Sequence, residues 1–156
     1  MGGRRLKSTK VKKLHGNPGR RPLPKNELEP ERGIPKPPRW LSADALKHWQ
    51  TLVPELDAAG VLTVVDGHAL ALLCEAYAEW RAACAAIKRH GKTYTQTTAA
   101  GKRTVLARPE VSMRSDAWSR YSRLILEFGL TPGSRSRVSA NPKKEKSDFQ
   151  KYLDGE

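Results

Sequence analysis

The chain has 156 residues, about the size of one domain, and its 29 lysines and arginines against 16 acidic residues give a formal net charge of +13. Neither a run of about 20 apolar residues nor the apolar segment of a signal peptide occurs, so we expect a cytoplasmic protein that does not enter a membrane. Cys74 and Cys84 fall on one predicted helix, too far apart for a disulfide within the chain.

The positive charge is concentrated at the start of the chain. Residues 1–39 hold twelve basic and three acidic residues, whereas residues 40–132 hold eleven and nine, and residues 133–156 hold six and four. Seven of the eleven prolines also lie in residues 1–39, where each removes a backbone donor and disfavours helix. We therefore expect a basic, disordered N-terminal arm and linker over residues 1–39, a folded core over 40–132 and a polar tail over 133–156.

Basic side chains without an apolar face favour contact with a polyanion, because each one that neutralises a phosphate releases condensed counterions. Such contacts hold nucleic acid without reading its sequence. A solvated tail without a partner is the alternative for this segment. The candidate phosphate contacts in the arm are Arg4, Arg5, Lys7, Lys10, Lys12, Lys13, Arg20 and Arg21.

The first predicted helix runs from Ala43 to about Ala58. Ser42 is a favourable N-cap, Asp44 suits the first turn, and apolar residues recur from Leu41 to Leu56 at helical spacing. Pro54 is expected to kink this helix or end it early.

A second, longer helix is predicted from Val64 to His90, with Thr63 and Asp66 as a capping box and Gly91 as the C-cap. The junction with the first helix resembles a helix-turn-helix, but its second helix begins without basic or amide side chains, so an αα-hairpin is favoured. At about 40 Å the long helix has more apolar surface than this chain can cover, and we expect part of it to contact another subunit. The interface candidates are Leu73, Tyr77, Trp80 and Ile87.

Residues 93–97 and 103–107 are rich in threonine, tyrosine and valine around Gly101, which predicts a short β-hairpin. The segment AAGKRT at its turn imitates the end of a phosphate-binding loop, but the required first glycine is replaced by Gln96. A third helix is predicted from Glu110 to Phe128, and Thr131 with Pro132 can start a short fourth one. The expected fold is mainly α, with a long central helix, an αα-hairpin, a β-hairpin and a basic disordered arm, in a chain that contacts another subunit.

No arrangement of residues indicates a catalytic site, a metal site or a cofactor. The four histidines have no metal-ligand spacing, and His15 beside Asn17 lies in the arm, where no neighbours would orient it. The aspartates fall where helix starts and turns favour them. Trp49, Trp80 and Trp118 lie on apolar stripes, which favours core packing over stacking on single-stranded nucleic acid.

The segments LHGNPGRRPLP, PKPPRWLS, HWQTLVPELDAAGVLTVVD and FGLTPGSRSRV, in this order, resemble the small subunit of phage terminases from about Leu14 to Val138. The resemblance implies a non-enzymatic factor that forms a ring of roughly eight to twelve subunits, recognises viral double-stranded DNA for packaging and regulates the large ATPase and nuclease subunit. It supports Arg20 and Arg21 as DNA contacts. It also marks Arg135 and Arg137 as exposed basic residues available to DNA or to the large subunit.

Two other functions remain open at this stage. A monomeric or dimeric nucleic-acid chaperone, or a ribosome-associated protein whose arm binds RNA, would have the same composition. A nuclease is a more distant alternative.

Overall fold

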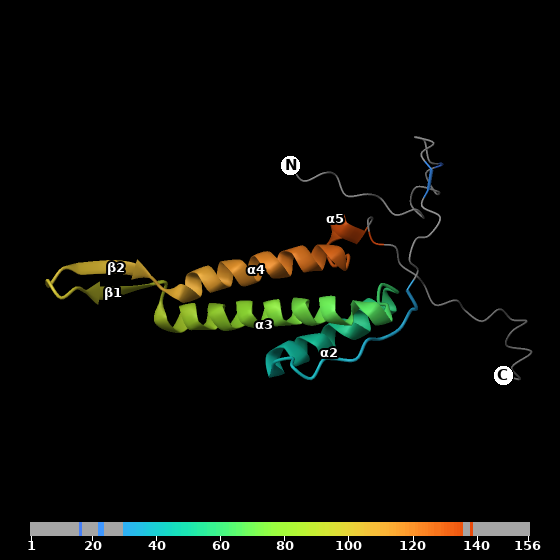
Figure 1. The fold of residues 1–156 in the computed structure, drawn as a ribbon, viewed down its shortest axis with the longest axis horizontal. Helices are drawn as coiled ribbons and strands as arrows, with labels where there is room; N and C mark the ends of the chain where they lie inside the picture. Colours follow the sequence, from blue (N-terminus) through green and yellow to red (C-terminus); the bar gives the residue numbers. More distant parts are fainter. Residues whose placement is uncertain (1–15, 17–21, 24–29, 136–137, 139–156) are drawn as a thin grey trace, which may run out of the picture.

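A computed structural model describes residues 16, 22–23, 30–135 and 138 of the chain. Its elements are α2 (Ala43–Ala58), a 3-10 turn (Val64–Asp66), α3 (Gly67–His90), β1 (Thr93–Thr97), β2 (Arg103–Ala107), α4 (Pro109–Glu127) and α5 (Pro132–Arg135). Helices α3 and α4 lie side by side and antiparallel, α2 packs on the first half of α3, and the β-hairpin extends beyond the shared end of α3 and α4 (Figure 1). The expectation of a mainly α fold with one β-hairpin is confirmed.

The N-terminus of α2 is held by a side chain from another helix. Ser42 caps α2 by accepting a hydrogen bond from the Ala45 amide at 3.3 Å. The carboxylate of Glu75 on α3 in turn accepts hydrogen bonds from the Ser42 amide and hydroxyl, the latter at 3.0 Å. The start of α2 is therefore tied to the middle of α3.

Helix α2 runs from Ala43 to Ala58 as predicted and continues through Pro54, so of the two expected effects of this proline the early end does not occur. A proline removes one backbone hydrogen bond from the helix. Leu52, Val53 and Leu56 around it are buried in the core, and Pro54 itself faces solvent. The apolar contacts of this turn outweigh the lost hydrogen bond.

The turn into α3 contains the capping box that the sequence predicts. Asp66 accepts hydrogen bonds from the Thr63 amide at 2.8 Å and from the Thr63 hydroxyl at 2.7 Å, which forms the capping box. The first three predicted helical residues form a 3-10 turn, and the α-helix starts at Gly67. At its other end, Gly91 has a φ of 78° and its amide donates to the Ile87 carbonyl at 2.9 Å. A glycine takes this left-handed conformation without the cost that a side chain would add.

The core lies between α2, α3 and the C-terminal half of α4. Trp49 from α2, Leu70 and Leu73 from α3, and Phe128 after α4 belong to one buried cluster, against which Tyr121, Leu124 and Ile125 of α4 pack. Helix α4 starts one residue before the predicted Glu110 and ends one residue before Phe128. Pro132 begins the short helix α5.

Contacts of the core reach upstream of Trp40. Arg32 forms a β-bridge with Thr63 and donates a hydrogen bond from Nη2 to the Asp57 carbonyl at 2.7 Å. Pro35 is buried, and a Cβ on Gly67 would lie 3.0 Å from the Pro35 Cβ, so this approach favours glycine at the start of α3. Residues 16, 22–23 and 30–39 of the predicted arm and residues 133–135 and 138 of the predicted tail are described. The rest of both segments lies outside the described residues, and its conformation stays a prediction.

The link between Glu75 and Ser42 predicts the effect of one substitution. Glu75→Ala leaves the start of α2 without its carboxylate partner, and we expect the free energy of unfolding to fall by about 1 kcal/mol. Urea denaturation at one fixed protein concentration measures this change. Glu55→Ala, which removes an exposed carboxylate from α2, is the matched control, and equal losses in both variants would contradict the role of Glu75.

Candidate nucleic-acid and assembly surfaces

The folded core separates its charges along its length. Residues 40–79 contain one lysine and six acidic residues, whereas residues 80–109 contain seven lysines and arginines and no acidic residue. The first block forms α2 and the first half of α3. The second, which we name the basic end, forms the rest of α3 and the β-hairpin and occupies the opposite end of the molecule (Figure 1). Its exposed members are Arg81, Lys88, Arg89, Lys92, Lys102 and Arg103.

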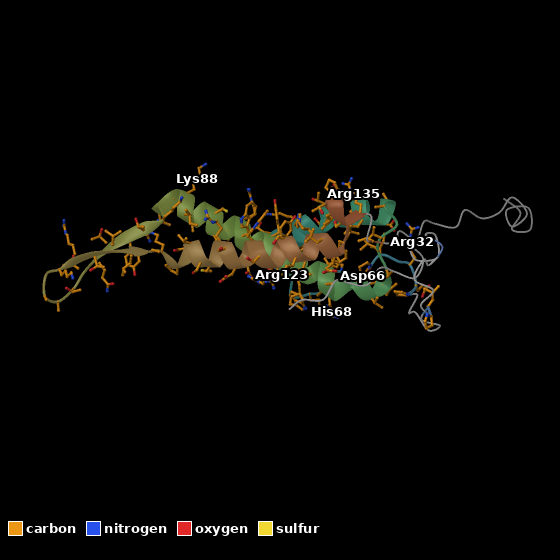
Figure 2. The ribbon with its side chains drawn as sticks, turned by 90° about the horizontal axis from the view of Figure 1, so that it is seen from above. Arg32, Asp66, His68, Lys88, Arg123 and Arg135 are labelled. Carbon is orange, nitrogen blue, oxygen red and sulfur yellow. The ribbon has the colours of Figure 1, made fainter. Side chains whose placement is uncertain are left out.

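The separation was not predicted, because residues 40–132 are nearly neutral when counted together. A run of 30 residues without an acidic side chain, from Trp80 to Pro109, is the sequence signal that could have found it. Figure 2 shows Lys88 near the base of the hairpin and Arg135 towards the other end of the molecule.

Arg108 joins the hairpin to the end of α3. Its amide donates to the Lys92 carbonyl at 2.9 Å, and its Nε donates to the His90 carbonyl at 3.2 Å. Its guanidinium lies over the ring of Tyr94, 5.7 Å from the ring centroid, which is a cation–π contact. These contacts hold the hairpin as an extension of the helix pair.

The predicted DNA contacts fall in different parts of the chain. Arg4, Arg5, Lys7, Lys10, Lys12, Lys13, Arg20, Arg21 and Arg137 lie outside the described residues. Arg135 is exposed on α5. The hydroxyl of the buried Ser134 accepts from the Thr131 amide at 3.2 Å and donates to the Thr131 carbonyl at 3.0 Å, which closes the turn at the start of α5.

The four interface candidates on α3 lie in two environments. Leu73 has 0% of its surface exposed, because it packs in the core cluster of this chain. It is therefore not available to a second copy. Tyr77, Trp80 and Ile87 are half-buried and keep surface that a neighbouring molecule can reach.

Five aromatic rings from three helices form a cluster along the seam between α3 and α4. His48 of α2 stacks on Tyr77 with ring centroids 3.9 Å apart, and Tyr77 lies 5.5 Å from Tyr121. Trp80 and Trp118 meet across α3 and α4 at 5.6 Å. The two tryptophans thus pack against each other, while 48% of Trp118 remains exposed. Core packing is confirmed for Trp49 and is only partial for Trp80 and Trp118.

Burial shapes the chemistry of two side chains in the core. It lowers the pKa of His48 below the ordinary 6.5, although the carboxylate of Glu55 opposes this effect. Burial, with a smaller contribution from Glu75, raises the pKa of Cys74 to about 12, so this thiol stays protonated and unreactive at neutral pH. Cys74 and Cys84 are both free thiols.

Within the described residues, no group of three or more histidine, cysteine, aspartate or glutamate side chains is placed to hold a metal ion. Over the same residues, no helix has the length and apolar character needed to cross a membrane.

A known protein family matches the helical core of this chain. The family described as phage terminase, small subunit, matches residues 45–145, which is 101 of the 156 residues. The chain belongs to the phage terminase small-subunit family. The resemblance found in the sequence is thereby confirmed, and the match spans α2, α3, the hairpin, α4 and α5 of this small terminase. Searches of curated proteins and of solved structures find no match.

His48 makes the stability of this small terminase depend on pH. Its Nε2 is buried and has no hydrogen-bond partner within the described residues. The folded state takes up the proton at lower pH than the unfolded chain, whose histidine titrates near 6.5, so stability falls as the pH drops below about 7. His48→Phe keeps a ring against Tyr77 and removes this titration. We expect a smaller loss of unfolding free energy between pH 7.5 and pH 5 than in the wild type.

Denaturation series at several pH values measure this loss. The matched control is His68→Phe, because His68 is an exposed histidine at the start of α3. A pH dependence in His48→Phe as steep as in the wild type would show that His48 is not the responsible group.

Proposed function

We propose that this small terminase binds double-stranded phage DNA, assembles into a ring and regulates the large terminase subunit during genome packaging. Family membership over the helical core carries the proposal. The formal charge of +13 supports it, because a ring of such chains attracts DNA strongly. In this scheme the chain has no catalytic site of its own and acts in the cytoplasm of the host, with the ATPase and nuclease supplied by the large subunit.

The basic arm is the proposed primary DNA contact. Its eight candidate lysines and arginines meet phosphates without reading base sequence. Arg135 on α5 and Arg137 after it are proposed as further contacts, either to DNA or to the large subunit. Arg32 and Pro35 pack on the turn between α2 and α3, so the arm enters the core at a fixed point.

Assembly is proposed to use the apolar surface that the helix pair leaves uncovered. Trp118 and Met113 on α4 and Leu72 on α3 are exposed apolar side chains. Exposed apolar surface of this kind is typical of an interface between subunits. Tyr77, Trp80 and Ile87 keep half-buried surface on α3, and we propose that they contribute to the same contact.

The arm proposal predicts a change in salt dependence. Arg20→Ala/Arg21→Ala removes two phosphate contacts, so the slope of log K against log salt for duplex binding should become shallower by about 1.8. Fluorescence anisotropy with a labelled duplex of phage DNA at several salt concentrations measures the slope. Lys36→Ala/Arg39→Ala removes the same charges next to the core and serves as the control. An unchanged slope in the Arg20 and Arg21 variant would count against the arm as the contact.

The assembly proposal predicts a change in mass. Trp118→Glu places a charge in the proposed interface and removes the apolar surface that the exposed half of the Trp118 side chain offers. We expect this change to weaken the free energy of association by about 2 kcal/mol per interface. Native mass spectrometry should then detect smaller species than the wild-type ring. Ser119→Glu puts the same charge on the exposed neighbouring position and should leave the mass unchanged.

A wild-type protein that is monomeric or dimeric at micromolar concentration would overturn the ring. Combined with a preference for RNA over duplex DNA, that result would favour a nucleic-acid chaperone.

A further inference from the structure

The β-hairpin is a two-stranded ribbon that no helix among the described residues covers. Thr93 pairs with Ala107 and Thr97 with Arg103 in an antiparallel register, and every residue of β1 is exposed. In β2, Val105 is 67% exposed. An isolated two-stranded ribbon is only marginally stable in water, so this exposed element gains most from a partner.

The tip of the ribbon is closed by hydrogen bonds and carries positive charge outward. The amide of Thr98 donates to the Lys102 carbonyl at 3.0 Å, and the amide of Gly101 donates to the Thr98 carbonyl at 2.9 Å. The Lys102 amide donates to the Thr98 hydroxyl at 3.2 Å. These bonds satisfy the backbone of the tip, while the side chains of Lys102 and Arg103 remain exposed.

We propose that the basic end binds the phosphate backbone of double-stranded DNA, with the ribbon lying in a groove, as a second contact separate from the arm. The inference rests on the proposed packaging function. All seven charged residues from Trp80 to Pro109 are positive, so this end attracts a polyanion and repels another copy of itself.

The shape of the element favours duplex DNA. The major groove of B-DNA, about 12 Å wide, admits a two-stranded β-ribbon, whereas the major groove of double-stranded RNA is too narrow. The strands of the hairpin extend about 17 Å, which is long enough to reach along a groove. Gln96 and Thr104, paired across the strands, are uncharged side chains that form hydrogen bonds with either phosphates or base edges.

Single-stranded nucleic acid fits the surface less well. Such ligands need open aromatic rings on which bases stack. In the part of the basic end that follows α3, residues 91–109, the aromatic side chain is that of Tyr94. The guanidinium of Arg108 already lies over its ring. Because Arg108 also ties the ribbon to α3, the hairpin is presented in a fixed direction, which lowers the entropy cost of binding.

The test compares two double variants of the full chain with equal losses of charge. Lys102→Ala/Arg103→Ala alters the hairpin tip, and Lys47→Ala/Arg123→Ala removes one lysine and one arginine from α2 and α4. Binding to a labelled 30-base-pair duplex is measured by anisotropy over a range of salt. We expect the slope of log K against log salt to become shallower by about 1.8 in the hairpin variant and to change little in the control.

A direct contact is tested in the same chain by photo-crosslinking. A photoreactive residue at position 100, in the hairpin tip, should crosslink to the duplex, whereas one at position 47 should not. Excess unlabelled duplex should compete for the crosslink better than single-stranded DNA or double-stranded RNA.

Three results would overturn the inference. Equal slopes in the two double variants, with no crosslink at position 100, would exclude a hairpin contact even if the arm variant still weakens binding. A hairpin variant with normal DNA affinity but altered assembly mass would show that the ribbon contacts the acidic block, residues 40–79, of a neighbouring copy. Preference for either competitor would exclude duplex DNA. If the wild-type chain does not bind duplex at all, the proposed function itself fails.

Discussion

The packing of α3 against α4 is the contact on which the rest of this small terminase depends. Alanines are buried on both helices, Ala83 on α3 and Ala117 on α4, and such small side chains let two helices approach closely. Trp80 and Trp118 meet farther along the same seam, and Arg120 of α4 pairs with Glu79 of α3 across it. Because the two helices are antiparallel, the connection between them must turn back at one end, and the β-hairpin is that connection.

The position of α2 follows from the same pair. Its apolar face closes the core over the first half of α3, where Trp49 and Leu56 are buried. Of the helices in the described part of the chain, α4 covers the second half of α3. The molecule therefore has a thick end with a three-helix core and a thin end that tapers into a ribbon (Figure 1). The buried side chains of the thick end stabilise the fold, whereas the thin end contributes few buried side chains to the core.

Local chemistry made the boundaries of the elements predictable from the sequence. Ser42, the pair of Thr63 and Asp66, and Gly91 act within a few residues of themselves, and the predicted ends of α2, the α3 turn and the hairpin agree with the structure. The sequence left open whether Pro54 kinks α2 or ends it early, and the early end does not occur because buried neighbours hold the helix together. Leu73 and Tyr77 lie on one apolar stripe, yet only the arrangement of α2 and α4 decides which of them faces the core.

The candidate binding surfaces differ in how far the sequence reveals them. The basic arm is visible as a concentration of charge, and the basic end is visible as the run from Trp80 to Pro109 without an acidic side chain, although counting residues 40–132 together conceals it. The contact of Arg32 with the α2–α3 turn, by contrast, joins residues 25 positions apart, which no local pattern indicates.

The separation of the acidic residues 40–79 from the basic end gives the helical core of each subunit an electric dipole along the helix pair. In any cyclic assembly the subunits are related by rotation, so the dipole components along the axis add and the components perpendicular to it cancel in the total. The tilt of α3 relative to the axis then determines whether a ring has one positive and one negative face or a charged rim. A ring with two unlike faces would approach DNA in one orientation, and the direction of loading would be encoded in the tilt of a single helix pair.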